Sequence, residues 1–194
     1  MKTSTEDGEV NWVQIVALSE QLGDLLLERK LQITTAESCT GGLIAGALTE
    51  VAGSSGWFQG GAVTYSNDAK NAMLGVPTEV FEQSGAVSEA CVQAMAVGAL
   101  REQGADMAIS VSGIAGPGGA VAGKPVGTVW IAWAFKQDAS SSAVASGTVT
   151  LPPPNVDATR FQLAGNRSTV RLHAVYQALR GIITRLENPE NLFK

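Results

Sequence analysis

Hydroxyl, thiol and glycine residues cluster in one short stretch of the chain, Glu-Ser-Cys-Thr-Gly-Gly at residues 37–42. The stretch lies between an apolar run at 31–36, which predicts a strand, and a helix-like run at 43–51. Such a junction directs backbone N–H groups and the positive end of a helix dipole at whatever lies in front of it. Ser38 is therefore a candidate nucleophile with an anion site beside it. The same residues also fit a plain helix start, with Ser38 or Thr40 as the cap.

A serine nucleophile needs a general base, and the sequence offers two kinds. The single histidine, His173, lies far along in a helical segment, so a Ser-His-Asp triad has little support. Lys70 follows Ser66 by one helical turn and can act as the base if burial keeps its amine neutral. Tyr65 could then relay a proton or orient the lysine. An ordinary solvated surface lysine fits the same spacing.

A second candidate motif runs from Gly118 to Lys124 and matches the glycine and lysine positions of a phosphate-binding P-loop. Pro125 stands where a P-loop has the Ser or Thr that binds magnesium, and residues 126–135 predict a strand where a P-loop opens a helix. We therefore reject an ATPase. A glycine-rich turn that contacts a ligand, or a plain loop, remains.

Three arginines form a third candidate feature. Arg160, Arg167 and Arg171 are spaced at i, i+7 and i+11 within residues 157–186, which we predict to be one long helix with a break near Gly165. Guanidinium groups on one helical face could hold a phosphate with paired hydrogen bonds. A solvated face paired with acidic residues fits slightly better.

Apolar periodicity and turn residues predict an α/β fold that positions these candidates. We expect helices at 12–27, 43–51, 67–74, 78–83, 88–103 and 157–186, and strands at 31–36, 61–65, 105–113, 126–135 and 143–151. This order predicts a mixed sheet with helices on both faces and a hairpin at one edge. Three polar segments follow strands, at 37–42, 65–70 and 110–119, and loops at the carboxyl ends of strands commonly build one ligand site.

Composition narrows the class of protein. The 194 residues, 45% hydrophobic and only 16% charged, suffice for one domain with a sizeable core. The net charge of −5 argues against a non-specific nucleic-acid binder, which needs a basic footprint. Cys39 and Cys91 with one histidine supply neither a disulfide framework nor four zinc ligands. We expect both cysteines to be intracellular thiols.

The chain ends carry no recognisable targeting signal. Residues 1–10 are polar and acidic, which predicts a flexible tail rather than a signal peptide. The longest apolar run, at 129–135, is far too short to span a membrane. We expect a cytoplasmic protein without membrane or nucleic-acid partners, with one domain over residues 11–188 and a second tail at 189–194.

Several ordered motifs carry a resemblance to a known family. They are Ala-Glu-Ser-Cys-Thr-Gly-Gly at 36–42, Gly-Gly-Ala-Val-Thr-Tyr-Ser-Asn at 60–67 with Lys70 after it, Ser-Gly-Ile-Ala-Gly-Pro-Gly-Gly at 112–119 and Lys-Pro-Val-Gly-Thr-Val at 124–129. Together with the later Gly165, Arg167 and Arg171, they resemble the CinA C-terminal domain family. The resemblance extends over about residues 12–187.

The resemblance implies a single-domain, three-layer α/β/α sandwich with a mixed sheet. It also implies an amidase that hydrolyses nicotinamide mononucleotide to nicotinate mononucleotide and ammonia, in the recycling of bacterial pyridine nucleotides. No cofactor and no metal are implied, and the partner is the small nucleotide substrate. We expect a homo-oligomer, a dimer or higher.

The family's serine, tyrosine and lysine fall on Ser38, Tyr65 and Lys70, which are the expected catalytic residues. Ser38 would attack the amide carbonyl, and Lys70 would take and return the proton. The oxyanion would be held by backbone N–H groups at 40–42. Substrate and oxyanion contacts are expected from the motif residues Glu37, Thr40, Gly41, Gly42, Ser66, Asn67, Ser112, Gly113, Gly116 and Arg167.

One motif departs from the family, and one alternative function stays open. The late family motif Phe-x-Gly-x-Arg has an acidic residue before its arginine, whereas Leu163 and Asn166 occupy those two positions here. The role of Arg167 in ligand contact is therefore open. A non-catalytic nucleotide-binding module of the same fold is the alternative, but it would not need Ser38, Tyr65 and Lys70 together.

Overall fold

The structure is a computed structural model that describes residues 10–137, 143–145, 148–150 and 152–188. Its helices are α1 (Trp12–Arg29), α2 (Leu43–Thr49), α3 (Asn67–Leu74), α4 (Thr78–Ser84), α5 (Glu89–Gln103) and α6 (Arg167–Glu187), with a short 3-10 turn at Ser54–Gly56. Its strands are β1 (Ile33–Glu37), β2 (Phe58–Val63), β3 (Met107–Gly113), β4 (Thr128–Phe135), β5 (Ala143–Ala145), β6 (Thr148–Thr150) and β7 (Asn155–Gln162). None of the helices in the described ranges is long and apolar enough to cross a membrane.

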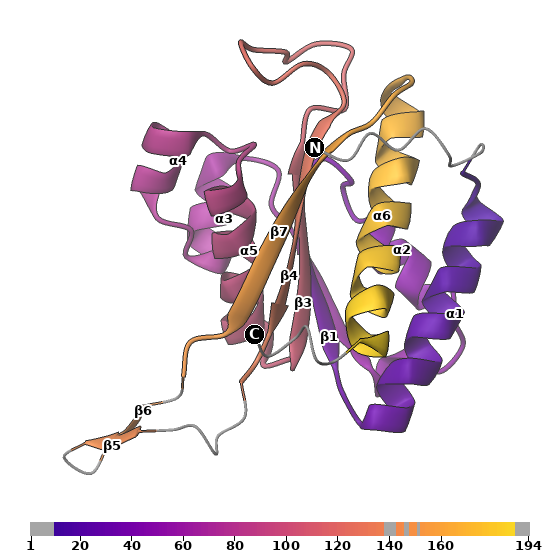
Figure 1. Cartoon of the computed structure of the whole chain (residues 1–194), viewed down its shortest axis with the longest axis vertical. Coiled ribbons are helices and arrows are strands. Elements are labelled where there is room, and N and C mark those ends of the chain that lie inside the picture. The colour runs from indigo at the N-terminus through magenta and orange to yellow at the C-terminus, as the bar shows by residue number, and fades with distance from the viewer. Residues whose placement is uncertain (1–9, 138–142, 146–147, 151, 189–194) are drawn as a thin grey trace.

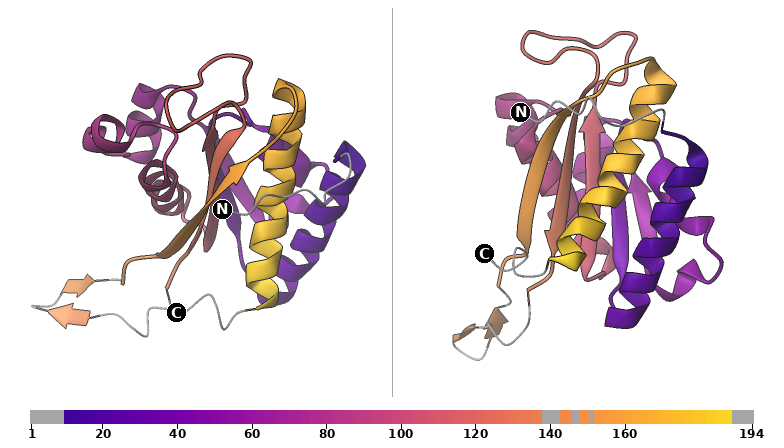
Figure 2. Two further views of the ribbon diagram at one scale, coloured as in Figure 1. Left: turned by 45° about the horizontal axis from the view of Figure 1, so that its top comes forward. Right: turned by 45° about the vertical axis from the view of Figure 1, so that its right-hand side comes forward.

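The layers are those of an α/β/α sandwich, as predicted. Helices α1, α2 and α6 cover one face of the main sheet, and α3, α4 and α5 cover the other (Figure 1). The rotated views show α6 and α1 side by side on their face (Figure 2). The small pair β5–β6 projects away from the sandwich at one end (Figure 1).

The main sheet is mixed, with strand order β2-β1-β3-β4-β7. Strand β1 runs parallel to both β2 and β3, whereas β4 runs antiparallel to β3 and β7. The carboxyl ends of β1, β2 and β3 therefore meet at one edge of the sheet. All residues of β1, which lies between β2 and β3, are buried.

Helix boundaries follow local capping chemistry. Asn11 and Gln14 form a capping box at the start of α1. Ser66 and Ser88 accept hydrogen bonds from backbone N–H groups at the starts of α3 and α5. Gly104 ends α5 in the left-handed conformation, which glycine adopts at little cost. The predicted helices at 67–74, 78–83 and 88–103 are thereby confirmed to within one residue at each end.

Each face of the sheet has its own apolar core. On the α5 face the sheet contributes small buried side chains, namely Ala36, Ala62, Ala108, Ala132 and Ala134. Larger side chains fill the α6 face, where the ring of Trp133 lies fully buried and its Nε1 donates to the carbonyl of Ala178 at 2.9 Å. The small residues on the α5 face allow that helix to approach the sheet closely.

The predicted edge hairpin exists, but its second strand was placed wrongly. We expected residues 143–151 to return along 126–135, and a helix to begin at Asp157. Instead β7 (Asn155–Gln162) pairs antiparallel with β4, β5 pairs only with β6, and α6 begins at Arg167. Val156 and Ala158 pack on the α5 side, whereas Phe161 packs on the α6 side, so alternate residues of β7 serve opposite faces. Residue 151 lies outside the described residues.

This correction removes the proposed three-arginine helix face. Arg160 lies on strand β7, and its guanidinium donates to the carbonyl of Gly123 at 2.8 Å. Arg167 and Arg171 remain together on α6, one turn apart. Only these two can act from a common helical surface.

The close packing of α6 on Trp133 at Gly181 can be tested by substitution. A Cβ at Gly181 would overlap the Trp133 ring, whereas a Cβ at Gly46 in α2 would meet no atom within 4 Å. Helix propensity alone favours alanine over glycine by about 1 kcal/mol at either position. Overpacking costs about 1–3 kcal/mol, so it exceeds that gain at Gly181.

We therefore expect Gly181→Ala to lower the free energy of unfolding by about 1–2 kcal/mol, and Gly46→Ala to raise it by about 0.5–1 kcal/mol. Urea unfolding of the two variants beside the parent protein measures both changes. Equal stabilisation by the two substitutions would contradict the packing of α6 on Trp133.

Candidate active site

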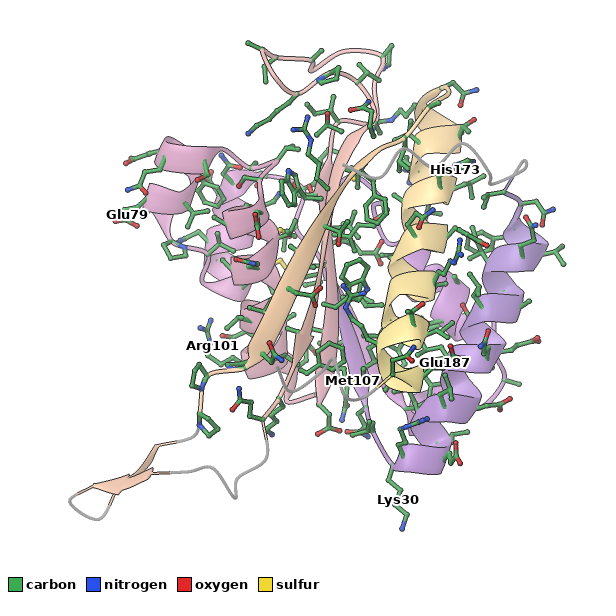
Figure 3. The ribbon with its side chains drawn as sticks, in the orientation of Figure 1. Lys30, Glu79, Arg101, Met107, His173 and Glu187 are labelled. Carbon is green, nitrogen blue, oxygen red and sulfur yellow. The ribbon has the colours of Figure 1, made fainter. Side chains whose placement is uncertain are left out.

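The polar segments identified in the sequence converge at one edge of the sheet. Lys30, just before β1, and Met107, the first residue of β3, mark the end of the molecule at which these two strands begin (Figure 3). Both strands therefore run toward the end where the long loop 114–127 and the first turn of α6 are found (Figure 1). The segments 38–42 after β1 and 64–66 after β2 reach this same edge.

Ser38 and Lys70 form a buried pair at this edge. The Nζ of Lys70 lies 3.1 Å from the Oγ of Ser38 and donates to the carbonyl of Thr64 at 2.7 Å. Lys70 is only 1% exposed, and Ser38 is 9% exposed. Helix α3 begins at Asn67 after its Ser66 cap, so Lys70 lies in its first turn and reaches back to the end of β1.

Burial shifts the protonation equilibrium of Lys70 toward the neutral amine. Desolvation lowers the pKa of Lys70 from its ordinary value of 10.5, because the charged amine loses its water. Negative thiolates at Cys91 and Cys39 would raise that pKa again. Burial, however, raises the pKa of Cys39 to about 12 and that of Cys91 to about 11, so both thiols are neutral near pH 7. The surroundings of Lys70 thus favour the neutral amine that a general base requires.

Glu37, the last residue of β1, caps helix α2. Its buried carboxylate accepts hydrogen bonds from the backbone N–H groups of Gly42, Ile44 and Ala45 at 2.8–3.1 Å. The positive end of α2 is therefore neutralised within the chain. Glu37 was expected to contact the substrate, but the structure uses it to hold the turn that follows β1.

Two of the three backbone N–H groups expected to hold an oxyanion, those of Gly41 and Gly42, have other partners. Gly41 donates to the carbonyl of Ser38 at 3.0 Å, and Gly42 donates to Glu37. Thr40 is fully buried, and its Oγ1 has no hydrogen-bond partner among the described residues. The Ser38–Cys39 peptide bond is trans, so the Cys39 N–H points away from the Ser38 carbonyl that Gly41 holds.

Tyr65 lies at the exposed rim of the site rather than inside the Ser38–Lys70 pair. Its side chain is 61% exposed, and its hydroxyl accepts a hydrogen bond from Nη2 of Arg167 at 2.7 Å. The other terminal nitrogen of Arg167 donates to the carbonyl of Gly116 at 2.8 Å. Within the described part of the chain, no hydrogen bond joins Tyr65 to Lys70. Arg167 thus connects the loops that follow β2 and β3.

The two predicted residues at the start of α3 have local roles in the structure. Ser66 accepts from the N–H of Ala69 at 3.0 Å and caps the helix. Asn67 is the first residue of the helix and is exposed to solvent. Both lie beside Tyr65 in the chain, at the outer side of the site.

The predicted site residues at the end of β3 and in the loop after it also lie at this edge. The hydroxyl of Ser112 donates to the carbonyl of Ala86 at 2.7 Å. A Cβ on Gly113 would press against β4, and Gly116 has a positive φ of 82°. The strand β4 that follows this loop confirms the rejection of a P-loop. Lys124, its P-loop-like lysine, donates instead to the carbonyl of Ser84 at 2.8 Å.

Two features of the site carried no clear signal in the sequence. One is the backbone carbonyl of Thr64, which binds Lys70 and is independent of side-chain type. The other is Arg171, whose Nε and Nη2 donate to the carbonyls of Cys39 and Thr40 at 3.1 and 2.8 Å. The sequence left open whether this arginine holds a phosphate or lies on a solvated face, and in the structure these donors bind the turn after Ser38. Among the described residues, no group of three or more His, Cys, Asp and Glu could hold a metal ion.

Comparison with known proteins identifies the family. The model of the CinA C-terminal domain matches residues 15–186. The chain belongs to the CinA C-terminal domain family. Among curated relatives of this CinA domain, nicotinamide-nucleotide amidohydrolase PncC of Escherichia coli strain K12 is 56% identical over 121 residues, covering 62% of this chain and 73% of that protein. The PncC protein of Pseudomonas putida is 47% identical over 169 residues, covering 87% of this chain and 95% of that protein.

Solved structures of CinA proteins share the fold. The competence damage-inducible protein A (ComA) from Klebsiella pneumoniae has a TM-score of 0.78 and 39% identity, covering 89% of this chain and 97% of that chain. The competence/damage inducible protein CihA from Agrobacterium tumefaciens has a TM-score of 0.77 and 40% identity, covering 95% and 99%. The predicted resemblance and fold class are thereby confirmed.

The structure also explains the departure in the late CinA motif. Asn166, which stands in place of the acidic residue, is the N-cap of α6 and accepts from the N–H of Thr169 at 3.0 Å. Asparagine and aspartate are about equally good in that position. Leu163, which replaces the aromatic residue, is buried in the α6-side core. With these two residues in place, helix α6 begins at Arg167.

Proposed function

We propose that this protein is a nicotinamide-nucleotide amidohydrolase in which Ser38 is the nucleophile and Lys70 the general base. The observation that carries the proposal is the buried contact of 3.1 Å between Lys70 Nζ and Ser38 Oγ. A lysine whose burial favours the neutral amine is able to remove a proton from a serine hydroxyl. The PncC names of the relatives supply the substrate class.

In the proposed acylation step, Ser38 Oγ attacks the carboxamide carbon while its proton passes to Lys70 Nζ. The carbonyl π electrons move to oxygen and form a tetrahedral oxyanion. Collapse of this intermediate breaks the C–N bond, and Lys70 returns the proton to the departing nitrogen, so that ammonia leaves. The product of this half-reaction is an ester of Ser38.

The Cys39 N–H is the proposed oxyanion donor. It belongs to the residue directly after the nucleophile, a position whose backbone N–H forms part of the oxyanion hole in hydrolases with a serine at a strand-to-helix turn. A single such donor is worth about 3 kcal/mol of transition-state stabilisation. In the second half-reaction, Lys70 deprotonates a water molecule that attacks the ester, and Ser38 recovers its proton as the nicotinate nucleotide leaves.

The rim of the site fits the rest of a nucleotide. Tyr65 offers an exposed aromatic ring, and Arg167 has guanidinium donors beyond the two bonds that it makes. An aromatic face can stack on the pyridine ring, and a guanidinium group can bind a phosphate. We propose these two residues as nucleotide contacts. Because Lys70 reaches Ser38 directly, a proton relay through Tyr65 is not required.

The substrate assignment is tested with a panel of nicotinamide mononucleotide, nicotinamide riboside and free nicotinamide. We expect ammonia and the matching nicotinate product in equal amounts, with the mononucleotide giving the highest kcat/KM. Calorimetric binding of the mononucleotide without release of ammonia, by protein with a normal thermal unfolding transition, would favour the non-catalytic nucleotide-binding module instead.

A further inference from the structure

Two side chains hold the turn at residues 38–42. One is the buried Glu37, directly before the turn, and the other is Arg171, which is distant in sequence. On one side, the Glu37 carboxylate binds the N–H groups of Gly42 and of the first turn of α2. On the other side, Arg171 from α6 binds the carbonyls of Cys39 and Thr40. The Glu37 carboxylate thus binds one backbone donor of the turn and two of α2, and the Arg171 guanidinium binds two backbone acceptors of the turn.

The contacts of Arg171 suit the shape of its side chain. Its Nε donates to the Cys39 carbonyl at 3.1 Å and its Nη2 to the Thr40 carbonyl at 2.8 Å. A guanidinium group presents these donors in a rigid, planar fork, so that two successive carbonyls are fixed relative to each other. The ammonium group of a lysine has no such fork.

These bonds complete the fixation of the nucleophile's backbone. The Ser38 N–H donates to the carbonyl of Val111 on β3 at 3.0 Å, and its own carbonyl accepts from Gly41. The next carbonyl in the chain, that of Cys39, is the one that Arg171 binds. Strand β3 therefore anchors Ser38 on one side, and helix α6 anchors the residue that follows it.

We propose that Arg171 is a positioning residue, which fixes the Ser38 turn so that Ser38 Oγ stays in contact with Lys70 Nζ. It acts through the backbone of Cys39 and Thr40, not on the substrate. The inference rests on the proposed function for its turnover assay, but the geometry of the nucleophile can also be tested without that substrate.

The experiment compares Arg171→Ala and Arg171→Lys with the parent protein. Arg185→Ala is the matched control, because Arg185 lies on the same helix and makes guanidinium contacts with Asp157 and the Trp133 ring. We expect Arg171→Ala to lower kcat by about 10- to 100-fold, since small displacements of a reacting group have effects of this size. KM should change by less than about 3-fold, because no substrate contact is lost.

Two further results separate positioning from mere stability. Added guanidinium chloride at low, non-denaturing concentration should restore part of the lost kcat in Arg171→Ala and none in Arg185→Ala. Arg171→Lys, which keeps the charge without the fork, should remain well below the parent in kcat. Unchanged kcat in a folded Arg171→Lys or Arg171→Ala variant would overturn the inference, as would a loss of kcat in Arg185→Ala equal to that in Arg171→Ala.

Labelling by a fluorophosphonate probe, followed by intact-protein mass spectrometry, distinguishes this inference from the proposed substrate. If the parent protein is labelled at Ser38 but hydrolyses no nicotinamide nucleotide, the proposed function fails. Slower labelling of Arg171→Ala than of Arg185→Ala would then still support positioning, and equal labelling rates would overturn it. If the parent is neither labelled nor active, both proposals fall.

Discussion

Replacement of Lys70 by methionine is expected to lower kcat by about 10²- to 10⁴-fold, the range typical for loss of a general base. Methionine fills a similar volume but cannot accept the proton of Ser38 Oγ, which Lys70 Nζ approaches to 3.1 Å. Ammonia release under saturating substrate measures the change. Replacement of the exposed Lys30, at the opposite end of β1, by methionine is the control and should leave kcat unaltered.

The same variant tests the protonation of Lys70 through stability. Burial lowers the pKa of Lys70, so the folded protein binds this proton less readily than the unfolded chain, in which the pKa is 10.5. Between the lowered value and 10.5 the unfolded state holds more protons, and the contribution of Lys70 to the free energy of unfolding rises with pH. Methionine has no such dependence. Burial raises the pKa of Cys39 to about 12 and that of Cys91 to about 11, so both thiols stay protonated in the folded protein from pH 7 to 9 and add nothing to the difference.

We therefore expect the parent protein to gain stability relative to Lys70→Met as the pH is raised from 7 toward 10. Urea unfolding of both proteins at pH 7, 8 and 9 gives this difference directly. A difference that stays constant with pH would mean that Lys70 titrates in the folded protein as it does in the unfolded chain.

The pH dependence of kcat/KM should reflect the same lowered pKa of Lys70. The limb of kcat/KM that rises with pH should level off below 10.5, because Lys70 becomes a free base earlier than an exposed lysine. A rate that keeps rising in proportion to hydroxide up to pH 10 would contradict catalysis by a lysine whose pKa is lowered.

The location of the site was predictable from the sequence because its chemistry rests on side chains in short, ordered motifs. Ser38 and Lys70 were both named as candidates, and the fold brings them into contact across 32 positions of the chain. The strand-to-helix junction at 37–42 fixed where Ser38 would lie. The helix cap at Ser66 fixed the turn from which Lys70 extends.

Strand β7 was not predictable in the same way. Residues 155–162 mix charged, polar and apolar types, and this mixture fits a helix as well as an edge strand. Pairing with β4 decides the outcome, because it satisfies the backbone of both strands and packs Phe161 and Val156 on opposite cores. That pairing is a tertiary effect.

Contacts between side chains and the backbone could not be predicted from the sequence either. Arg171 binds two carbonyls more than 130 positions away in the chain, and carbonyls leave no mark in the residue types of a sequence. Glu37 was identified as part of the site, but its three backbone partners appear only once α2 is in place. The contact between Tyr65 and Arg167 likewise depends on where α6 begins.

Ser38→Ala is expected to have the largest effect of all, a loss of more than about 10⁴-fold in kcat. The substitution removes the atom that would form the ester and leaves the backbone bonds of Ser38 to Val111 and Gly41 in place. Ser19→Ala is the matched control, because this buried hydroxyl donates only to the carbonyl of Ile15 within α1. Both variants should show thermal unfolding transitions close to that of the parent.

The decisive measurement is ammonia release from nicotinamide mononucleotide by the parent protein, Ser38→Ala and Ser19→Ala, assayed side by side at equal concentration. We predict full turnover by the parent and by Ser19→Ala, and none above background by Ser38→Ala. Turnover by Ser38→Ala at the rate of the parent would contradict the account, because it would show that the nucleophile lies elsewhere.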